Sequence, residues 1–77
     1  MKPYETIQEV LEAAKIHGPY VKISCGRYYL ITAIYEIGEN SWSCVLDRYA
    51  KGSLTPQEFL TEGTWQDGSQ CGKNENN

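Results

Sequence analysis

Several features that the sequence lacks exclude whole classes of protein. Within its 77 residues no apolar run approaches the roughly 20 residues of a membrane-spanning helix, and no signal peptide opens the chain. No glycine spacing matches a Walker or dinucleotide-binding loop. Charges of both signs are dispersed, and a net charge of −3 disfavours a duplex-binding protein, which needs a basic stripe. We therefore expect a cytoplasmic protein with no membrane contact and no cofactor.

Side chains that serve as nucleophiles or metal ligands are also scarce. Cys25, Cys44 and Cys71 are odd in number and show no CxxC spacing, which favours reduced thiols over disulfides or a zinc knuckle. Cys44 alternates with apolar residues and is predicted to be a core residue, Cys71 falls in a polar tail, and Cys25 lies in a turn where its redox role stays open. His17, the only histidine, is expected to interact favourably with the dipole at the end of the first helix. No metal site is predicted.

Paired carboxylates suited to acid–base catalysis are hard to find. Glu36, Glu39 and Asp47 are the best placed, because they surround one predicted hairpin. Acidic residues at hairpin ends are usually solvated or lightly paired, here with Arg48 and Lys22. We therefore predict no catalytic residue and no enzymatic activity.

The first third of the chain has the pattern of an amphipathic helix over Pro3–His17. Its apolar residues follow three- and four-residue steps, and acidic residues near the start and basic residues near the end match the helix dipole. Gly18 and Pro19 end it. Three strands follow, Tyr20–Ser24, Tyr28–Ile37 and Trp42–Tyr49, joined by loops too short for a crossover, which predicts an antiparallel meander.

The remainder of the chain predicts one short helix and a tail. Thr55 can cap a helix, Pro56 fits its first position, Glu58 completes a capping box and Gly63 ends it. Residues 67–77 hold no large apolar side chain, so we expect a disordered polar tail after a single domain over 1–66. The fold class predicted is α+β, with an α-β-β-β-α order and the first helix packed on one face of a three-stranded antiparallel sheet.

The central strand is apolar on both faces. Strict alternation puts Tyr29, Ile31, Ala33, Tyr35 and Ile37 on one face, and the other face is also largely apolar, with Tyr28, Leu30 and Ile34. The first helix can shield only one face. The other needs the carboxy-terminal helix, a second copy or another protein as cover.

These observations favour a small non-catalytic protein that binds and modulates a partner protein through an aromatic sheet surface. Aromatic residues and arginine are enriched at interface anchors. The alternatives are a weak single-stranded nucleic-acid binder that stacks bases on the same tyrosines, and a self-associating homodimer. In style such a domain resembles the accessory and inhibitor proteins of phages and mobile elements, without a shared motif. The predicted contact residues are Tyr20, Lys22, Arg27, Tyr28, Leu30, Ile34, Trp42, Arg48 and Tyr49.

Overall fold

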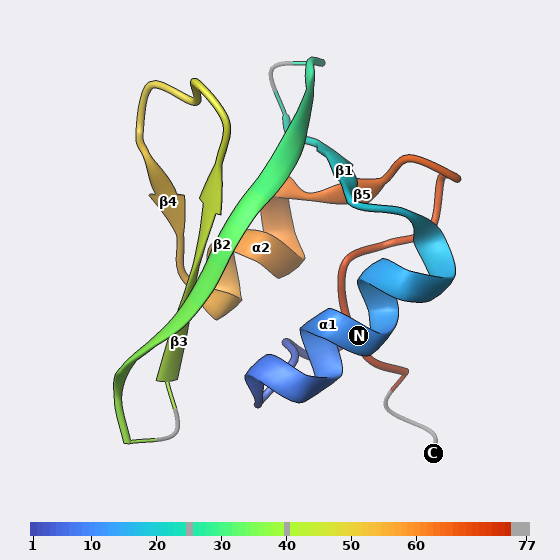
Figure 1. The fold of residues 1–77 in the computed structure, drawn as a ribbon. Helices are drawn as coiled ribbons and strands as arrows, with labels where there is room; N and C mark the ends of the chain where they lie inside the picture. Colours follow the sequence, from blue (N-terminus) through green and yellow to red (C-terminus); the bar gives the residue numbers. More distant parts are fainter. Residues whose placement is uncertain (25, 40, 75–77) are drawn as a thin grey trace.

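The computed structural model describes residues 1–24, 26–39 and 41–74. It has the predicted α+β class, with a helix before the strands and a short helix after most of them (Figure 1). The sheet is larger than predicted, because two strands of two residues each extend the three-stranded meander. The strands are β1 (Tyr20–Lys22), β2 (Tyr28–Gly38), β3 (Ser41–Leu46), β4 (Ser53–Leu54) and β5 (Thr64–Trp65).

All neighbouring strands of the sheet are antiparallel, in the order β4-β3-β2-β1-β5. The long strand β2 joins two halves, since its first residues pair with β1 and its later residues pair with β3. The last strand in the sequence, β5, therefore lies beside the first strand, β1. This long-range pairing brings the carboxy-terminal segment back to the residues that follow the first helix.

Both helices begin at capping boxes. Helix α1 (Ile7–His17) starts after Thr6, whose hydroxyl accepts from the Glu9 N–H, and α2 (Pro56–Glu62) starts after Thr55 in the same way. The caps predicted at Thr55 and Gly63 are confirmed. Helix α1 starts four residues later than predicted, because the chain before Thr6 is extended. Within the described ranges, no helix combines the length and apolar character needed to cross a membrane.

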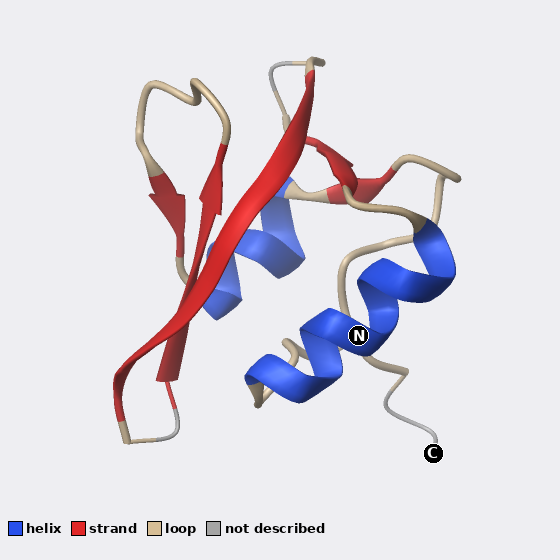
Figure 2. Ribbon diagram, in the orientation of Figure 1, coloured by secondary structure: helices blue, strands red, loops and turns tan. Residues whose placement is uncertain are grey.

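The core lies on one face of the sheet and takes residues from both helices (Figure 2). Phe59 of α2 is at its centre, with its ring 5.6 Å from that of Trp42 and 5.5 Å from that of Trp65. Val10 of α1 is fully buried in the same cluster. Because both helices fill this side, the carboxy-terminal helix is not the cover of the opposite face, which was one of the three covers considered from the sequence.

A β-bulge in β2 changes which residues face the core. Ile31 pairs with Leu46 and Ala33 pairs with Val45, so Thr32 is an extra residue on β2. The Thr32 hydroxyl donates to the Val45 carbonyl at 3.2 Å. From Ala33 to Glu36 the alternation is reversed, because a one-residue shift moves the following side chains to the other face. A second register shift lies between Glu36 and Gly38, at Ile37.

Residues 67–74 follow a defined path against the domain, where the sequence predicted a disordered tail over 67–77. The Trp65 N–H donates to the Ser69 carbonyl at 2.7 Å, and the backbones of Lys2 and Lys73 exchange hydrogen bonds of 3.0 and 2.7 Å. Cys71 is fully buried. The prediction failed over 67–74 because a small thiol and backbone pairing order a segment that has no large apolar side chain; residues 75–77 lie outside the described ranges.

Replacing Cys71 tests this ordered segment. We expect Cys71→Ser to lower the free energy of unfolding by about 1–3 kcal/mol, because the hydroxyl would be buried without a prepared partner. Urea unfolding followed by tryptophan fluorescence measures the change. The exposed neighbour provides the control, since Gln70→Ala should change stability by less than about 0.5 kcal/mol. Equal and negligible effects of the two substitutions would contradict the burial of Cys71.

Candidate functional site

The face of the sheet opposite the helices exposes large side chains. Tyr20, Tyr28, Tyr35 and Ile37 keep 45, 52, 46 and 55% of their surface exposed. Ala33, also exposed, lies between them on β2. We call this surface the open face; it consists of Tyr20, Tyr28, Leu30, Ala33, Tyr35 and Ile37. Exposed apolar and aromatic patches of this kind often mark interaction sites, because their exposure to water is unfavourable.

Three of the predicted contact residues do not lie on the open face, and the bulge at Thr32 accounts for one of them, Ile34. Ile34 pairs with Cys44 and packs against the core, so it does not share a face with Leu30. Trp42 is 1% exposed, and its indole N–H donates to the Tyr4 carbonyl at 2.9 Å. Tyr49 is half-buried and packs edge-on against Tyr29, with ring centres 5.2 Å apart. These three side chains stabilise the domain from within.

Five of the other predicted contact residues come together at one end of β2. They line a hollow of about 340 Å³, which we call the arginine hollow. Its lining residues are Tyr20, Arg27, Tyr28, Tyr29, Leu30, Asp47 and Arg48. Lys22 lies beside it, with its ammonium group 5.8 Å from the centre of the Tyr28 ring. Residues from β1, β2 and the β3–β4 loop therefore form one surface, as the sequence predicted for this part of the set.

The β3–β4 loop holds Arg48 at the hollow in an uncommon conformation. The Asp47 N–H donates to the Leu30 carbonyl at 2.9 Å, which ties the loop to β2. Arg48 then adopts a φ of 57°, and no other described residue except glycine has a positive φ. For a residue with a Cβ atom the left-handed conformation costs about 1–2 kcal/mol. The loop therefore holds this arginine at a conformational cost.

The cations at the arginine hollow form no ion pair among the described residues, a property that they share with Lys15 but not with the other three lysines. Among the described residues, Lys2, Lys51 and Lys73 each form ion pairs with glutamates. The remaining four cations are Lys15, Lys22, Arg27 and Arg48, and all but Lys15 lie at or beside the hollow. The only acidic side chain that lines it is Asp47. This end of an acidic protein is thus locally positive.

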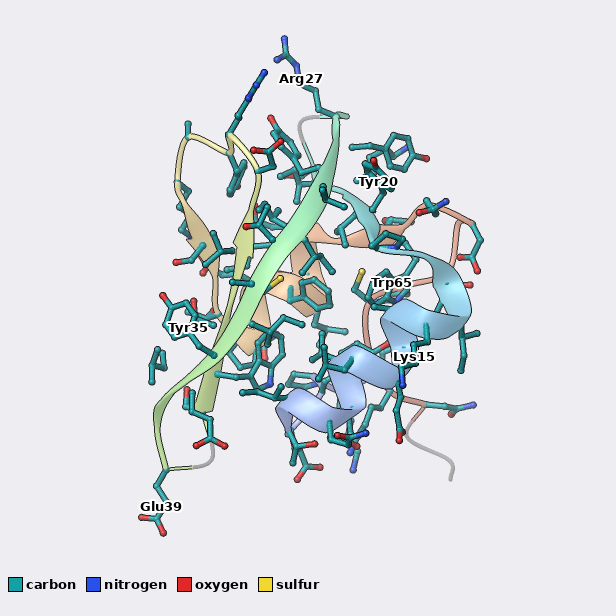
Figure 3. All side chains as sticks on the ribbon, in the orientation of Figure 1. Lys15, Tyr20, Arg27, Tyr35, Glu39 and Trp65 are labelled. Atoms are coloured by element: carbon teal, nitrogen blue, oxygen red, sulfur yellow. The ribbon has the colours of Figure 1, made fainter. Side chains whose placement is uncertain are left out.

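The acidic residues considered for catalysis are far apart. Figure 3 shows Arg27 and Glu39 at opposite ends of β2, and Asp47 lies at the Arg27 end. Glu36 lines a small hollow beside the start of α1 with Thr6. Asp47 and Glu36 line different hollows of the described structure, so Asp47 does not converge with Glu36 or Glu39 on one site.

A second hollow, of about 600 Å³, lies along α1. It is lined by more acidic and basic side chains, tyrosine not counted, than the arginine hollow. We call it the α1 hollow; it is lined by Lys2, Tyr4, Glu9, Glu12, Ala13, Ile16, His17, Lys73 and Asn74. The Lys73 ammonium contacts Glu5 at 2.9 Å and Glu9 at 2.8 Å. The hydrogen bond from Lys73 lowers the pKa of both carboxyls, and the two carboxylates raise the pKa of Lys73. The ion pairs of Lys73 with Glu5 and Glu9 therefore hold the carboxy-terminal segment against the start of α1.

His17 forms the other tether at the α1 hollow. Its Nδ1 lies 2.6 Å from an oxygen of Asp67, and its ring stacks on Trp65 with centres 5.6 Å apart. The hydrogen bond from His17 lowers the pKa of Asp67 to about 2. An imidazole held by a carboxylate can move a proton, but catalysis also needs a reacting partner within reach. No local sequence pattern points to this pair, because its members are 50 residues apart.

Neither described thiol can act as that partner. Cys44 is fully buried, as predicted, and burial raises its pKa to about 12. Burial also raises the pKa of Cys71, which the sequence had placed in an exposed tail. Tyr4 has its pKa raised by burial, and its hydroxyl accepts a hydrogen bond from the Trp65 indole at 3.3 Å. Cys25 lies outside the described residues. Within the described ranges, no three potential metal-ligating side chains form a cluster.

Tyr35 and Ile37 are the contact candidates that sequence analysis missed. Strict alternation placed both on the face with Tyr29, which packs on the core. No local signal marks Thr32 as the extra residue. The pairing with β3 is what reveals it, so these two residues could be assigned only from the tertiary structure.

The His17–Asp67 pair makes a prediction about acid stability. A carboxyl whose pKa is lower in the folded protein contributes stability above its unfolded pKa of 3.8, and the contribution is lost as pH falls toward about 2. We expect Asp67→Asn to show a smaller loss of stability than the wild type between about pH 4 and pH 2. Urea unfolding across this range measures it. The exposed Asp47 provides a matched control: if Asp47→Asn flattens the profile as much as Asp67→Asn, the role of the pair is disproved.

Comparison of the chain with models of protein families, with curated proteins and with solved structures finds no match in any of the three. The function must therefore be inferred from the residues of the chain itself. The open face and the arginine hollow are the features on which such an inference can be based.

Proposed function

We propose that this protein is a non-catalytic module that binds and modulates a partner protein through its open face. The observation that carries the proposal is that both helices pack into one core while Tyr20, Tyr28, Tyr35 and Ile37 stay exposed on the other face. Burial of apolar area is the main driving force of protein association. Tyrosine beside arginine is also the composition of interface anchors. An accessory or inhibitor role in the cytoplasm fits a surface of this kind.

The α1 hollow is the strongest competing site and supports catalysis poorly. Its lysines and Glu9 are paired with one another or with Glu5, and His17 is tied to Asp67. Apart from the local Lys2–Glu5 pair, these contacts join residues 1–17 to residues 67–73, so they fasten the carboxy-terminal segment to α1. A structural role accounts for each of them.

Substitutions on the open face test the proposal. We expect Tyr35→Ser combined with Ile37→Ser to leave stability within about 1 kcal/mol, because both side chains are exposed, and to abolish retention of the partner. The measurement is quantitative mass spectrometry of proteins retained by each bait from the native host. Ile16→Ser is the matched control, since Ile16 is 77% exposed but lies on α1. A set of retained proteins that is the same for all three baits would contradict the proposal.

Single-stranded nucleic acid is a second candidate occupant, and a second copy of the chain is a third. Tyr20 and Tyr28 beside Lys22 and Arg27 could stack bases near phosphates. We expect only weak binding of labelled oligothymidylate, and a steep loss of tight binding with rising salt would favour the nucleic-acid function instead. In sedimentation across the micromolar range we expect a monomer. A dimer dissociated by Tyr35→Ser would identify the second copy as the occupant.

A further inference from the structure

We infer that the arginine hollow binds a carboxylate side chain from an acidic segment of the partner protein, with the guanidinium groups of Arg27 and Arg48 as the recognising cations. This inference rests on the proposed function, because the hollow forms one end of the open face. It adds the chemistry of the bound segment, which exposed aromatic area alone does not specify.

The absence of internal partners at the hollow is the first support. Within the part of the chain that the structure describes, no acidic side chain forms an ion pair with Arg27, Arg48 or Lys22. The other basic residues, except Lys15, have such pairs, although the chain has ten acidic side chains in total. Acidic residues are therefore abundant but are placed elsewhere. Among the described residues no acidic side chain forms the complementary ion pair, and on this inference the partner supplies it.

The conformation of Arg48 is the second support. A left-handed backbone would suit glycine or asparagine better, and Gly52 in the same loop has a φ of 91°. Non-glycine residues in this region cluster at functional sites, where the surrounding structure holds them. Here the bond from the Asp47 N–H to the Leu30 carbonyl fixes the loop. The backbone of Arg48, which lines the hollow, is thereby held in place.

The shape and composition of the hollow favour a carboxylate within a peptide over a nucleic acid. Arginine forms bidentate hydrogen bonds with a planar carboxylate, and Tyr20, Tyr28 and Leu30 provide aromatic and apolar walls for the neighbouring residues of a peptide. A strand of phosphates would need several more cations along its path. A short acidic segment requires only the cations that are present.

Binding of a defined acidic peptide tests the inference. The probe is fluorescein-labelled hexaglutamate, and its binding to the full-length protein is followed by fluorescence anisotropy at low salt. We expect Arg48→Gly to weaken binding at least about tenfold, as expected for loss of a charge-assisted hydrogen bond. The same substitution should keep or raise the thermal midpoint, because glycine removes the cost of the left-handed conformation. Loss of binding would therefore not be due to unfolding.

Lys15→Gln provides the matched control. Lys15 is an exposed cation on α1 without an ion pair, and Figure 3 shows it far from Arg27. The substitution removes the same charge as Arg48→Gly, and we expect it to change the affinity less than about twofold, because exposed distant charges are screened. Equal effects of the two substitutions, or no binding of hexaglutamate by the wild type, would overturn the inference. Arg48-dependent binding of oligothymidylate without binding of hexaglutamate would also overturn it.

These outcomes are distinguishable from failure of the proposed function. Tyr35 and Ile37 do not line the arginine hollow, so the double variant should bind hexaglutamate normally while it loses the partner. Partner capture that depends on Tyr35 and Ile37, with no effect of Arg48→Gly on the peptide, would leave the proposed function standing and remove the carboxylate site. Hexaglutamate binding that depends on Arg48, without partner capture that depends on Tyr35 and Ile37, would keep the carboxylate site and remove the proposed function.

Discussion

The packing of Phe59 against Trp42, Trp65 and Tyr4 holds the remaining elements together. The Trp42 indole donates to the Tyr4 carbonyl, and the Trp65 indole donates to the Tyr4 hydroxyl. One aromatic cluster thus joins α2, β3, β5 and the segment before α1. No buried side-chain polar atom of the described residues lacks a hydrogen-bond partner. In a domain of this size such a cluster supplies much of the buried area, because few residues are available for a core.

Formation of that cluster on one side of the sheet leaves the other side bare. Phe59 reaches the core from α2, and Val10 reaches it from α1, so both helices are committed to the same face. A chain of 77 residues has no third helix among the described residues to cover the opposite face. The exposure of Tyr28 and Tyr35 is therefore a consequence of where the core forms.

The distribution of charge follows the same division. Near α1, ion pairs and the His17–Asp67 contact fasten the carboxy-terminal segment, and the charges there are mutually compensated. At the Arg27 end of β2, Arg27 and Arg48 form no ion pair with any described acidic residue. The charges near α1 therefore stabilise the fold, whereas the cations at the arginine hollow are the ones that we propose to bind another molecule.

The sequence by itself determined the features that depend on neighbouring residues. The spacing of apolar residues located α1, the Thr55 and Glu58 pair located the start of α2, and three strand segments were recognised from their composition. Five of the predicted contact residues line one hollow, namely Tyr20, Arg27, Tyr28, Leu30 and Arg48, and their role in binding a partner stays a prediction. Only the tertiary structure decided the bulge at Thr32, the pairing of β5 with β1 and the burial of Cys71. These depend on contacts between distant residues, which local patterns do not encode.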